Sequence, residues 1–327
     1  MIIHTDADAD LSLIRSRRVA VVGYGGQGHA HALNLRDSGV TELVVALRPA
    51  SARRGVAEAA GFPVMSASEA AAWADVVMIL APDEDQPRLW AEEIAPNRGV
   101  GAAVGFAHGL AVHFGHIDLD GAPAFLIAPK GPGRLVRSKF LEGQGLPCLL
   151  AVTTPPALPL ALSYGSAIGC GRSAMIETTF AAECVTDLFG EQAVLCGGIP
   201  DLIRAGYDTL VEAGHPPELA YFECVHEAKQ IVDLIHDGGM AAMRAGVSNT
   251  AEFGGYRTGA RLVTADTRAE MRRVLDDITS GRFAKRLISD HAEGDPEMTR
   301  FRADAADPSL EAAGERVRSL MPWVGRS

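Results

Sequence analysis

Residues 18–39, "RVAVVGYGGQGHAHALNLRDSG", decide how the first half of the chain folds. The opening "RVAVVGYG" is a largely apolar run that predicts a buried strand, and "HAHALNLRDSG" has the pattern of a helix that ends at Gly39. Between them stands "GYGGQG", in which Gly23, Gly25 and Gly28 match G-x-G-x-x-G. A strand, a glycine-rich turn and a helix in this order are typical of a dinucleotide-binding unit.

The three glycines have separate roles in such a unit. The first makes the tight turn, the second lets a pyrophosphate approach the backbone, and the third lets the helix pack closely on the strand. The helix N-terminus then faces the anion. A glycine-rich turn without a ligand is the alternative, but the strand and the helix on either side favour dinucleotide binding.

The second strand, "ELVVALR" (42–48), indicates which dinucleotide is bound. An NAD site usually has an Asp or Glu near this position, which holds the ribose 2′-hydroxyl. Here the strand ends in Arg48, and Ser51, Arg53 and Arg54 follow. These donors can grip a 2′-phosphate, and no acid is present to repel it. A solvated basic loop is the alternative, and we predict NADPH.

Short apolar runs alternate with helical patterns through the first half of the chain. Further runs lie at 75–82, 100–108, 123–133 and 147–153. This alternation predicts a parallel sheet covered by helices on both faces. From about Thr178 helical patterns replace the strands, at 178–196, 199–213, 217–236, 240–247 and 266–280. We therefore predict an α/β Rossmann-type domain over 1–181 and an all-α domain over 182–327, with a peripheral tail at 292–318.

The composition excludes several classes of protein. The chain has 327 residues, 47% hydrophobic and 22% charged, which suits a globular protein with two domains. A formal net charge of −11 without a Lys/Arg run argues against nucleic acid or a membrane surface as a partner. We see no signal peptide and no run that could span a bilayer. Five cysteines without a C-x-x-C pair favour reduced thiols, so we expect a cytoplasmic location.

The segment "ETTFAAECVTDLFGEQAVLC" (177–196) places three acids on one helical face. Glu183, Asp187 and Glu191 are four residues apart, and like charges at that spacing repel each other. No Lys or Arg occurs between Arg172 and Arg204 to offset them. A solvated acidic face is one explanation, and a bound cation is the other.

A second pair of acids, Glu223 and Glu227, lies in "AYFECVHEAKQIVDLI". On a helix these acids share a stripe with apolar residues, namely Ala220, Ile231 and Leu234. Burying ionised carboxylates there costs several kcal/mol unless they are paired or bind a metal. Oxygen ligands from two helices suit Mg²⁺. His226 would argue for zinc, but it lies off the stripe, and we interpret it as a packing residue.

Two further candidates stand at the carboxyl ends of predicted strands. His108 follows the run at 100–108 and precedes Gly109, and Lys130 lies in "PKGPG" after the next run. Ligands of open α/β sheets bind at this edge. A functional role is therefore favoured over a surface position for both side chains.

These motifs together resemble ketol-acid reductoisomerase, in its short bacterial form, over nearly the whole chain. The matching segments are "VGYGGQGHAHALNLRDSGV", "ADVVMILAPDEDQP", "FAHGLAVHFG", "APKGPG", "ETTF", "TDLFGEQAVLCGG", "PELAYFECVHE", "IVDLI", "SNTAEFG" and "MPW". The resemblance implies Mg²⁺-dependent alkyl migration in a 2-aceto-2-hydroxy acid, then reduction by NADPH to a 2,3-dihydroxy acid, in branched-chain amino-acid synthesis. It also implies a knotted helical domain and a homodimer, with a larger assembly such as a dodecamer left open.

The resemblance also implies roles for individual residues. Asp187 would bridge two Mg²⁺ ions, Glu191 would bind one, and Glu223 and Glu227 of a partner subunit would serve the other. Glu183 would support these ligands, and Ser248 would hydrogen-bond the substrate. His108 and Lys130 would lie near the nicotinamide and the reacting oxygens. The cofactor would contact Gly23, Tyr24, Gly25, Gly26, Gln27, Gly28, Arg48, Ser51, Arg53, Asp83, Gln86 and Gly133.

Five positions depart from the family's usual pattern without removing a metal ligand. They are Gly26 and Arg53 in place of serines, Ala111 in place of asparagine, Arg134 in place of histidine, and Gly255 in place of an acid. Two alternatives stay open at this point, a paralogue that only reduces 2-keto acids and a non-catalytic dimeric binding protein. The general base stays open between a hydroxide on the metal, Lys130 and a carboxylate, and the preferred ketol acid is also open.

Overall fold

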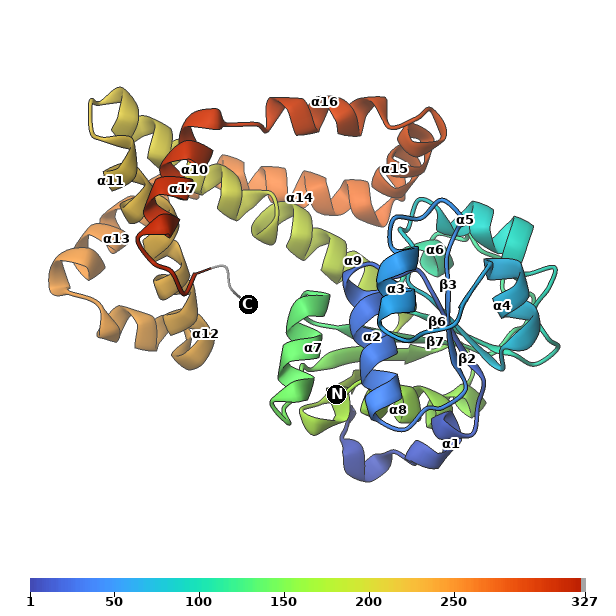
Figure 1. Ribbon diagram of the computed structural model, residues 1–327. Helices are drawn as coiled ribbons and strands as arrows, with labels where there is room; N and C mark the ends of the chain where they lie inside the picture. The colour runs from blue at the N-terminus through green and yellow to red at the C-terminus, as the bar shows by residue number, and fades with distance from the viewer. Residues whose placement is uncertain (325–327) are drawn as a thin grey trace. The chain divides into compact units, whose positions relative to one another are not determined.

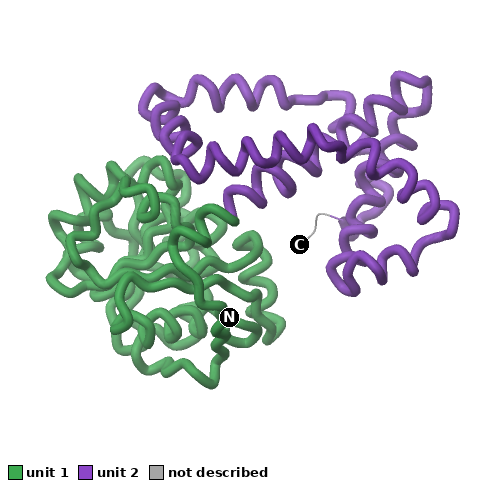
Figure 2. The backbone as a smooth tube through the Cα atoms, turned by 180° about the vertical axis from the view of Figure 1, so that it is seen from behind, with its two compact units in different colours: residues 1–186 green, residues 187–327 purple. Residues whose placement is uncertain are grey.

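The computed structural model describes residues 1–324 and divides into two compact units, Met1–Thr186 and Asp187–Ser327 (Figure 2). The division falls inside helix α9 (Phe180–Gly190), later than the boundary after residue 181 that the sequence suggests. The reason is local packing. Phe180, at the start of α9, is buried in a core of the first unit, so the first turns of the helix stay with the sheet.

The first unit is built on one nine-stranded sheet with the order β1-β9-β8-β7-β6-β5-β2-β3-β4 among the described residues. The central strands are parallel, and Val19 of β2 pairs with Leu43 of β3 on one side and Val76 of β5 on the other. The strands are β1 (Ile3–His4), β2 (Val19–Val22), β3 (Leu43–Ala46), β4 (Val64–Met65), β5 (Val76–Ile79), β6 (Ala103–Phe106), β7 (Ala124–Pro129), β8 (Cys148–Val152) and β9 (Met175–Glu177).

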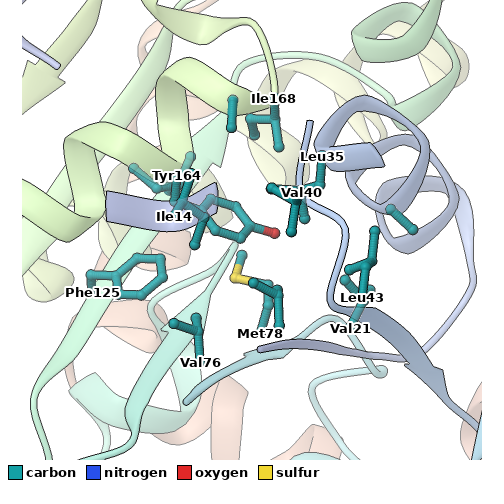
Figure 3. Packing of buried hydrophobic residues seen from close by; sticks show 14 of the residues in the cluster. Ile14, Val21, Leu35, Val40, Leu43, Val76, Met78, Phe125, Tyr164 and Ile168 are labelled. Carbon is teal, nitrogen blue, oxygen red and sulfur yellow. The ribbon is translucent and has the colours of Figure 1, made fainter. Parts of the chain in front are cut away.

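Each central strand supplies alternate side chains to two separate cores. Val19, Val21 and Met78 belong to the first core, which Figure 3 shows around Tyr164. Ala20 and Val22 belong to the second core, on the opposite face. Because both faces are buried, these strands are apolar at every position, as parallel sheets require.

Helices cover both faces of the sheet (Figure 1). On the first face α2 packs against α7, and α1 packs against α8. These helices are α1 (Leu11–Arg15), α2 (Gly26–Asp37), α7 (Gly133–Leu141) and α8 (Leu158–Ala167), with α3 (Arg54–Ala59) after β3. The second face carries α4 (Ala67–Trp73), α5 (Gln86–Leu89) with a π-turn (Trp90–Ile94), and α6 (Leu110–His113).

The sheet is not wholly parallel, which corrects the sequence-based expectation. Strand β8 runs antiparallel to β7, with Pro129 opposite Cys148. The Lys130 amide, just after β7, donates to the Pro147 carbonyl oxygen, just before β8, at 2.9 Å. The end of β7 and the start of β8 therefore lie side by side. Strands β1, β4 and β9 were not predicted, because two or three residues are too few to show a periodic pattern.

The second unit is all-helical over its described residues. After α9 and a π-turn (Glu191–Leu195) come α10 (Gly198–Glu212), α11 (Pro217–Tyr221), a π-turn (Phe222–His226), α12 (Glu227–Gly246), α13 (Asn249–Leu262), α14 (Ala265–Thr279), α15 (Arg282–Ala292), α16 (Pro296–Asp304) and α17 (Pro308–Ser319). A small core contains Tyr207, Tyr221 and Val317. Helices α13 and α15 were not predicted, and glycines weaken the helical pattern of α13.

Two expectations concern the chain as a whole. No helix in the part of the chain that the structure describes is long and apolar enough to cross a membrane. The knotted threading that the family resemblance implies stays a prediction.

A buried histidine couples the stability of the first unit to pH. His31 of α2 is fully buried, and its Nδ1 lies 2.9 Å from the Tyr164 hydroxyl oxygen. Its Nε2 has no hydrogen-bond partner. Burial lowers the pKa of His31 from the ordinary 6.5 to about 3. The ring is therefore neutral in the folded chain. A protonated ring would carry a second N–H, at Nε2, for which the site has no acceptor.

We predict that acidification destabilises the chain through His31. Between pH 6.5 and 3 the unfolded chain binds a proton at His31 that the folded chain does not, so stability falls as pH falls. The loss amounts to about 2 kcal/mol by pH 5. His31→Asn should be less stable at pH 7, but its free energy of unfolding in urea should change less between pH 7 and 5. His113→Asn, outside this core, should keep the wild-type pH dependence. An unaltered pH dependence in His31→Asn would contradict the prediction.

Candidate functional site

The glycine turn has the geometry that a dinucleotide requires. Gly23 has a φ of +100°, and a Cβ there would lie 2.6 Å from the Leu80 carbonyl oxygen. A Cβ on Gly28 would lie 2.2 Å from the carbonyl oxygen of Gly23. The first and third glycines are thus demanded by the backbone. A Cβ on Gly25 would meet nothing within 4 Å, so the outer side of the turn is open to a ligand.

A second helix begins at the same place. Gly133 is the first residue of α7, and a Cβ there would lie 2.1 Å from the Gly26 carbonyl oxygen. The Gln27 side-chain amide donates to the Gly131 carbonyl oxygen at 3.0 Å, which ties the two loops together. The N-termini of α2 and α7 therefore meet at one point. Two helix N-termini favour a bound anion such as a pyrophosphate.

A pocket of about 410 Å³ adjoins this turn. Its lining includes Gly25 and Gly26 together with three arginines, Arg53, Arg134 and Arg137. Within the described chain, no Asp or Glu lines it. The pocket is therefore built for an anionic group rather than for a neutral hydroxyl.

The remaining predicted cofactor residues lie in the loops after β3 and β5. The Ser51 hydroxyl oxygen accepts a hydrogen bond from the Arg53 amide at 3.3 Å. The Gln86 side-chain amide donates to an Asp83 carboxylate oxygen at 2.9 Å, which stiffens the second loop. Arg48 is largely exposed and lies 3.9 Å from a carboxylate oxygen of Asp85. Its guanidinium is thus accessible to a ligand.

His29 and Arg137 are pocket residues that the sequence did not single out. Arg137 donates to Asn34 Oδ1 at 2.7 Å and to Asp37 Oδ2 at 2.6 Å, so its guanidinium is held in place. A signal for it existed, because Arg134 and Arg137 are three residues apart at the start of the helix that follows "PKGPG". His29 offered no comparable signal, since only the fold brings α2 and α7 together.

Three predicted residues meet around one buried carboxylate. Glu183 of α9 has a side chain that is only 1% exposed. It accepts hydrogen bonds from Lys130 Nζ at 3.1 Å and from the Gly109 amide at 2.8 Å. His108 Nδ1 lies 3.4 Å from Glu183 Oε2. His108 and Lys130 follow the neighbouring strands β6 and β7, so the carboxyl edge of the sheet brings them together.

This cluster is strongly coupled electrostatically. Burial by itself would raise the pKa of Glu183, but His108 and Lys130 hold that pKa below its ordinary value. Burial opposes a charge on His108, yet hydrogen bonding to Cys184 and Glu183 raises the pKa of His108 to about 11. The carboxylate of Asp83 acts in the same direction. Cys184 is a neighbour of His108 that the sequence did not indicate.

One group in the described chain has the donor set of a metal site. Asp187 lies one turn after Glu183 on α9, and single ligand atoms of Asp187, Glu183 and His108 lie within 4.8 Å of one another. Two carboxylates can hold a divalent cation, whereas His108, with its raised pKa, is protonated and offers no free ring nitrogen as a ligand. Among the described residues, Glu191, Glu223 and Glu227 do not belong to such a group.

The second carboxylate pair is not buried within its own unit, and its place in a site shared with a partner subunit stays a prediction. Glu223 and Glu227 are exposed, and so are Ile231 and Leu234 on the stripe they share. The reason is that this face of α12 has no covering element in its own unit. Glu191 is also exposed and begins a π-turn, and Glu223 lies in the other π-turn of this unit. Such turns occur frequently at functional sites.

Two further candidates have structural roles in the second unit. The Ser248 hydroxyl caps helix α13 by accepting a hydrogen bond from the Ala251 amide at 3.2 Å, and its contact with substrate stays a prediction. His226 packs its ring edge-on against Phe222 at 5.7 Å between centroids, in line with a packing residue.

Comparison with known proteins covers both units. Residues 13–174 match the acetohydroxy acid isomeroreductase, NADPH-binding domain, and residues 180–323 match the ketol-acid reductoisomerase, C-terminal domain. The solved structure of an NADH-preferring ketol-acid reductoisomerase from an uncultured archean is 38% identical, with a TM-score of 0.93. That alignment covers 98% of this chain and 99% of the other.

Two more distant structures share the fold alone. A semialdehyde dehydrogenase NAD-binding protein from Cupriavidus necator is 19% identical with a TM-score of 0.57, over 81% of this chain and 100% of that chain. A pyrroline-5-carboxylate reductase from Coxiella burnetii is 13% identical with a TM-score of 0.55, over 83% and 98%. The two domain matches and the full-length 38% identity decide the family. The chain belongs to the ketol-acid reductoisomerases and has their activity, which serves branched-chain amino-acid biosynthesis.

Proposed function

We propose that this reductoisomerase uses NADPH and two Mg²⁺ ions per site, and that it works as a homodimer whose subunits share their metal ligands. Its substrate is a 2-aceto-2-hydroxy acid, which it converts to a 2,3-dihydroxy acid. The observation that carries the cofactor choice is the pocket beside the glycine turn, where three arginines gather without an acid.

The preference for NADPH follows from the charge of that pocket. A phosphate on the adenosine ribose carries about −1.5 to −2 charges near neutral pH and can accept several charge-assisted hydrogen bonds. NADH has no phosphate at this position and would bring no negative charge to Arg53. The archaeal relative prefers NADH, so the family accepts either cofactor and the local residues decide between them.

The metal proposal rests on the carboxylates of α9 and of the second unit. Glu183 and Asp187 offer oxygen ligands at the sheet edge, beside His108. Glu191 follows one turn later, exposed to receive an ion. Mg²⁺ prefers oxygen ligands and keeps several waters, so a few carboxylates suffice.

The dimer proposal rests on an apolar surface that the chain itself leaves exposed. Large apolar side chains of the second unit that are more than a third exposed include Leu202, Leu219, Ile231, Val232, Leu234, Met240, Phe253, Tyr256 and Leu262. Exposed apolar surface on this scale is typical of an interaction site. Glu223 and Glu227 are exposed as well, on the same helical stripe as Ile231 and Leu234. If a second copy covers this stripe, Glu223 and Glu227 become part of the metal site that the two subunits share.

The residues at the sheet edge then have distinct tasks. When bound, the ions stabilise the negative charge that develops on neighbouring substrate oxygens, and the nicotinamide supplies the hydride. Lys130 holds a proton at Nζ, where it can exchange with a substrate oxygen. Glu183 orients Lys130 through a 3.1 Å hydrogen bond and keeps His108 protonated. The side chain of His108 is only 15% exposed, so water is largely excluded from it.

The overall reaction is tested with two substrates. We expect the chain to turn over 2-acetolactate with Mg²⁺ and NADPH, and to reduce a 2-keto-3-hydroxy acid offered directly. Turnover of the second substrate alone would contradict the isomerisation step. A higher kcat/KM with NADH than with NADPH would contradict the cofactor choice.

We predict that Arg53→Ala lowers kcat/KM for NADPH by about tenfold or more, because it removes a charge-assisted hydrogen bond to the 2′-phosphate. The value for NADH should hardly change. Arg54→Ala is the matched control, since Arg54 pairs with Glu58 and does not line the pocket. Equal losses with both cofactors would instead indicate a structural role for Arg53.

We predict that two inactive variants restore each other if the metal ligands are shared between subunits. Glu191→Gln and Glu223→Gln should each abolish isomerisation and weaken Mn²⁺ binding, as measured by electron paramagnetic resonance. A mixed dimer has one site with both changes and one intact site. Because half of the dimers are mixed at random pairing, co-expression should restore about a quarter of the activity.

The control for this experiment is Glu270→Gln, a surface acid that pairs with Arg273. It should keep full activity and metal binding. Failure of the co-expressed pair to recover activity, with mixed dimers verified by mass, would mean that each subunit holds its metals alone.

A further inference from the structure

One residue of the arginine pocket carries a buried polar atom that the fold does not use. Tyr24 is 3% exposed, it lines the pocket, and its hydroxyl has no hydrogen-bond partner. The ring is held by edge-on packing against His29 at 5.3 Å and against Phe62 at 6.0 Å between centroids. A buried hydroxyl without a partner is unfavourable. A ligand in the pocket would supply the missing acceptor.

His29 packs against the Tyr24 ring, and the charged side chains that line the pocket with it are arginines. It stands on the first turns of α2, and the pocket faces it with Tyr24 from its own turn, Arg53 from the loop before α3, and Arg134 and Arg137 from α7. Asp37 is the nearby acid, and it is held by Arg137. Burial, then Arg137 and Arg53, lower the pKa of His29. The ring is therefore neutral at pH 7 when no anion is present.

We propose that the Tyr24 hydroxyl and the His29 ring bind the phosphate on the adenosine ribose, and that His29 takes up a proton as this phosphate enters. Both are then specificity-determining residues that lie outside the loop after β3. This inference rests on the proposed use of NADPH. It adds that the binding of NADPH is coupled to protonation of His29. Selection of the phosphorylated cofactor strengthens as pH falls toward 6.5.

The direction of the pH effect on affinity follows from the charges. A phosphate brings negative charge next to a ring that cations had kept neutral, and an opposite charge favours the protonated ring. The complex then binds more proton at His29 than the separate partners do, so affinity rises as pH falls. The phosphate itself protonates near pH 6, which opposes the effect below that pH. NADH has no phosphate at this position, so its affinity lacks this dependence.

Calorimetry with adenosine 2′,5′-bisphosphate and 5′-AMP tests the proton uptake. Titration at pH 7 in two buffers of different protonation enthalpy gives the number of protons bound with each ligand. We expect uptake with the bisphosphate and none with 5′-AMP. His29→Gln should reduce the uptake with the bisphosphate to zero or below, and His113→Gln, outside the pocket, should leave it unchanged. Unaltered uptake in His29→Gln would overturn the proposal.

The hydroxyl is tested by Tyr24→Phe, which keeps the ring packing on His29 and Phe62. Affinity for the bisphosphate should fall about tenfold, as expected for one hydrogen bond to a charged group. Affinity for 5′-AMP and the thermal midpoint should stay the same. An equal loss for both ligands would show that Tyr24 only shapes the turn, and it would overturn the role of the hydroxyl.

A measurement on the unaltered chain guards against variants that fail to fold. The NMR titration of the His29 ring should move to higher pH when the bisphosphate is bound, and an unmoved titration would overturn the proposal. A wild-type chain that binds the bisphosphate no tighter than 5′-AMP would overturn the use of NADPH as well. Tighter binding of the bisphosphate without a change at His29 would overturn the proton linkage alone.

Discussion

The buried carboxylate of Glu183 is the interaction on which the reacting end of the first unit depends. It accepts hydrogen bonds from Lys130 and from the Gly109 amide, and it lies beside His108. These partners come from the loops after two neighbouring strands, so one acid joins helix α9 to two points of the sheet edge. A charge buried this deeply is tolerated only because it is paired and hydrogen-bonded. Removing Glu183 would take away the acceptor of Lys130 and one of the groups that keep His108 protonated.

A contrasting electrostatic environment exists at the phosphate turn. There the backbone packs so tightly that Gly23, Gly28 and Gly133 have no room for a side chain. The space beside the turn is lined by arginines, and no carboxylate among the lining residues compensates them. The first unit therefore has a balanced cluster of charges around Glu183 and an excess of positive charge along the lining of the pocket. An anionic cofactor is what this imbalance favours.

The second unit shows a different kind of incompleteness. Its small core around Tyr207 and Tyr221 buries little of the apolar surface that its helices carry. Ile231, Leu234 and the acids between them stay exposed. The sequence pattern predicts that this stripe is buried, because apolar residues recur at helical spacing, and its burial against a second copy stays a proposal. A single chain lacks the surface that would cover it.

Much of the fold and part of the site could be determined from the sequence by itself. The residues within 18–39 are enough to predict its strand, turn and helix, because backbone sterics and apolar periodicity act between near neighbours. The same holds for the candidates His108, Lys130 and Glu183. The tertiary structure alone decided that these three meet, that β8 runs antiparallel to β7, and that Tyr24 and His29 form a pocket with Arg137. Such contacts join residues up to about a hundred positions apart, and no local spacing records which helix packs beside which.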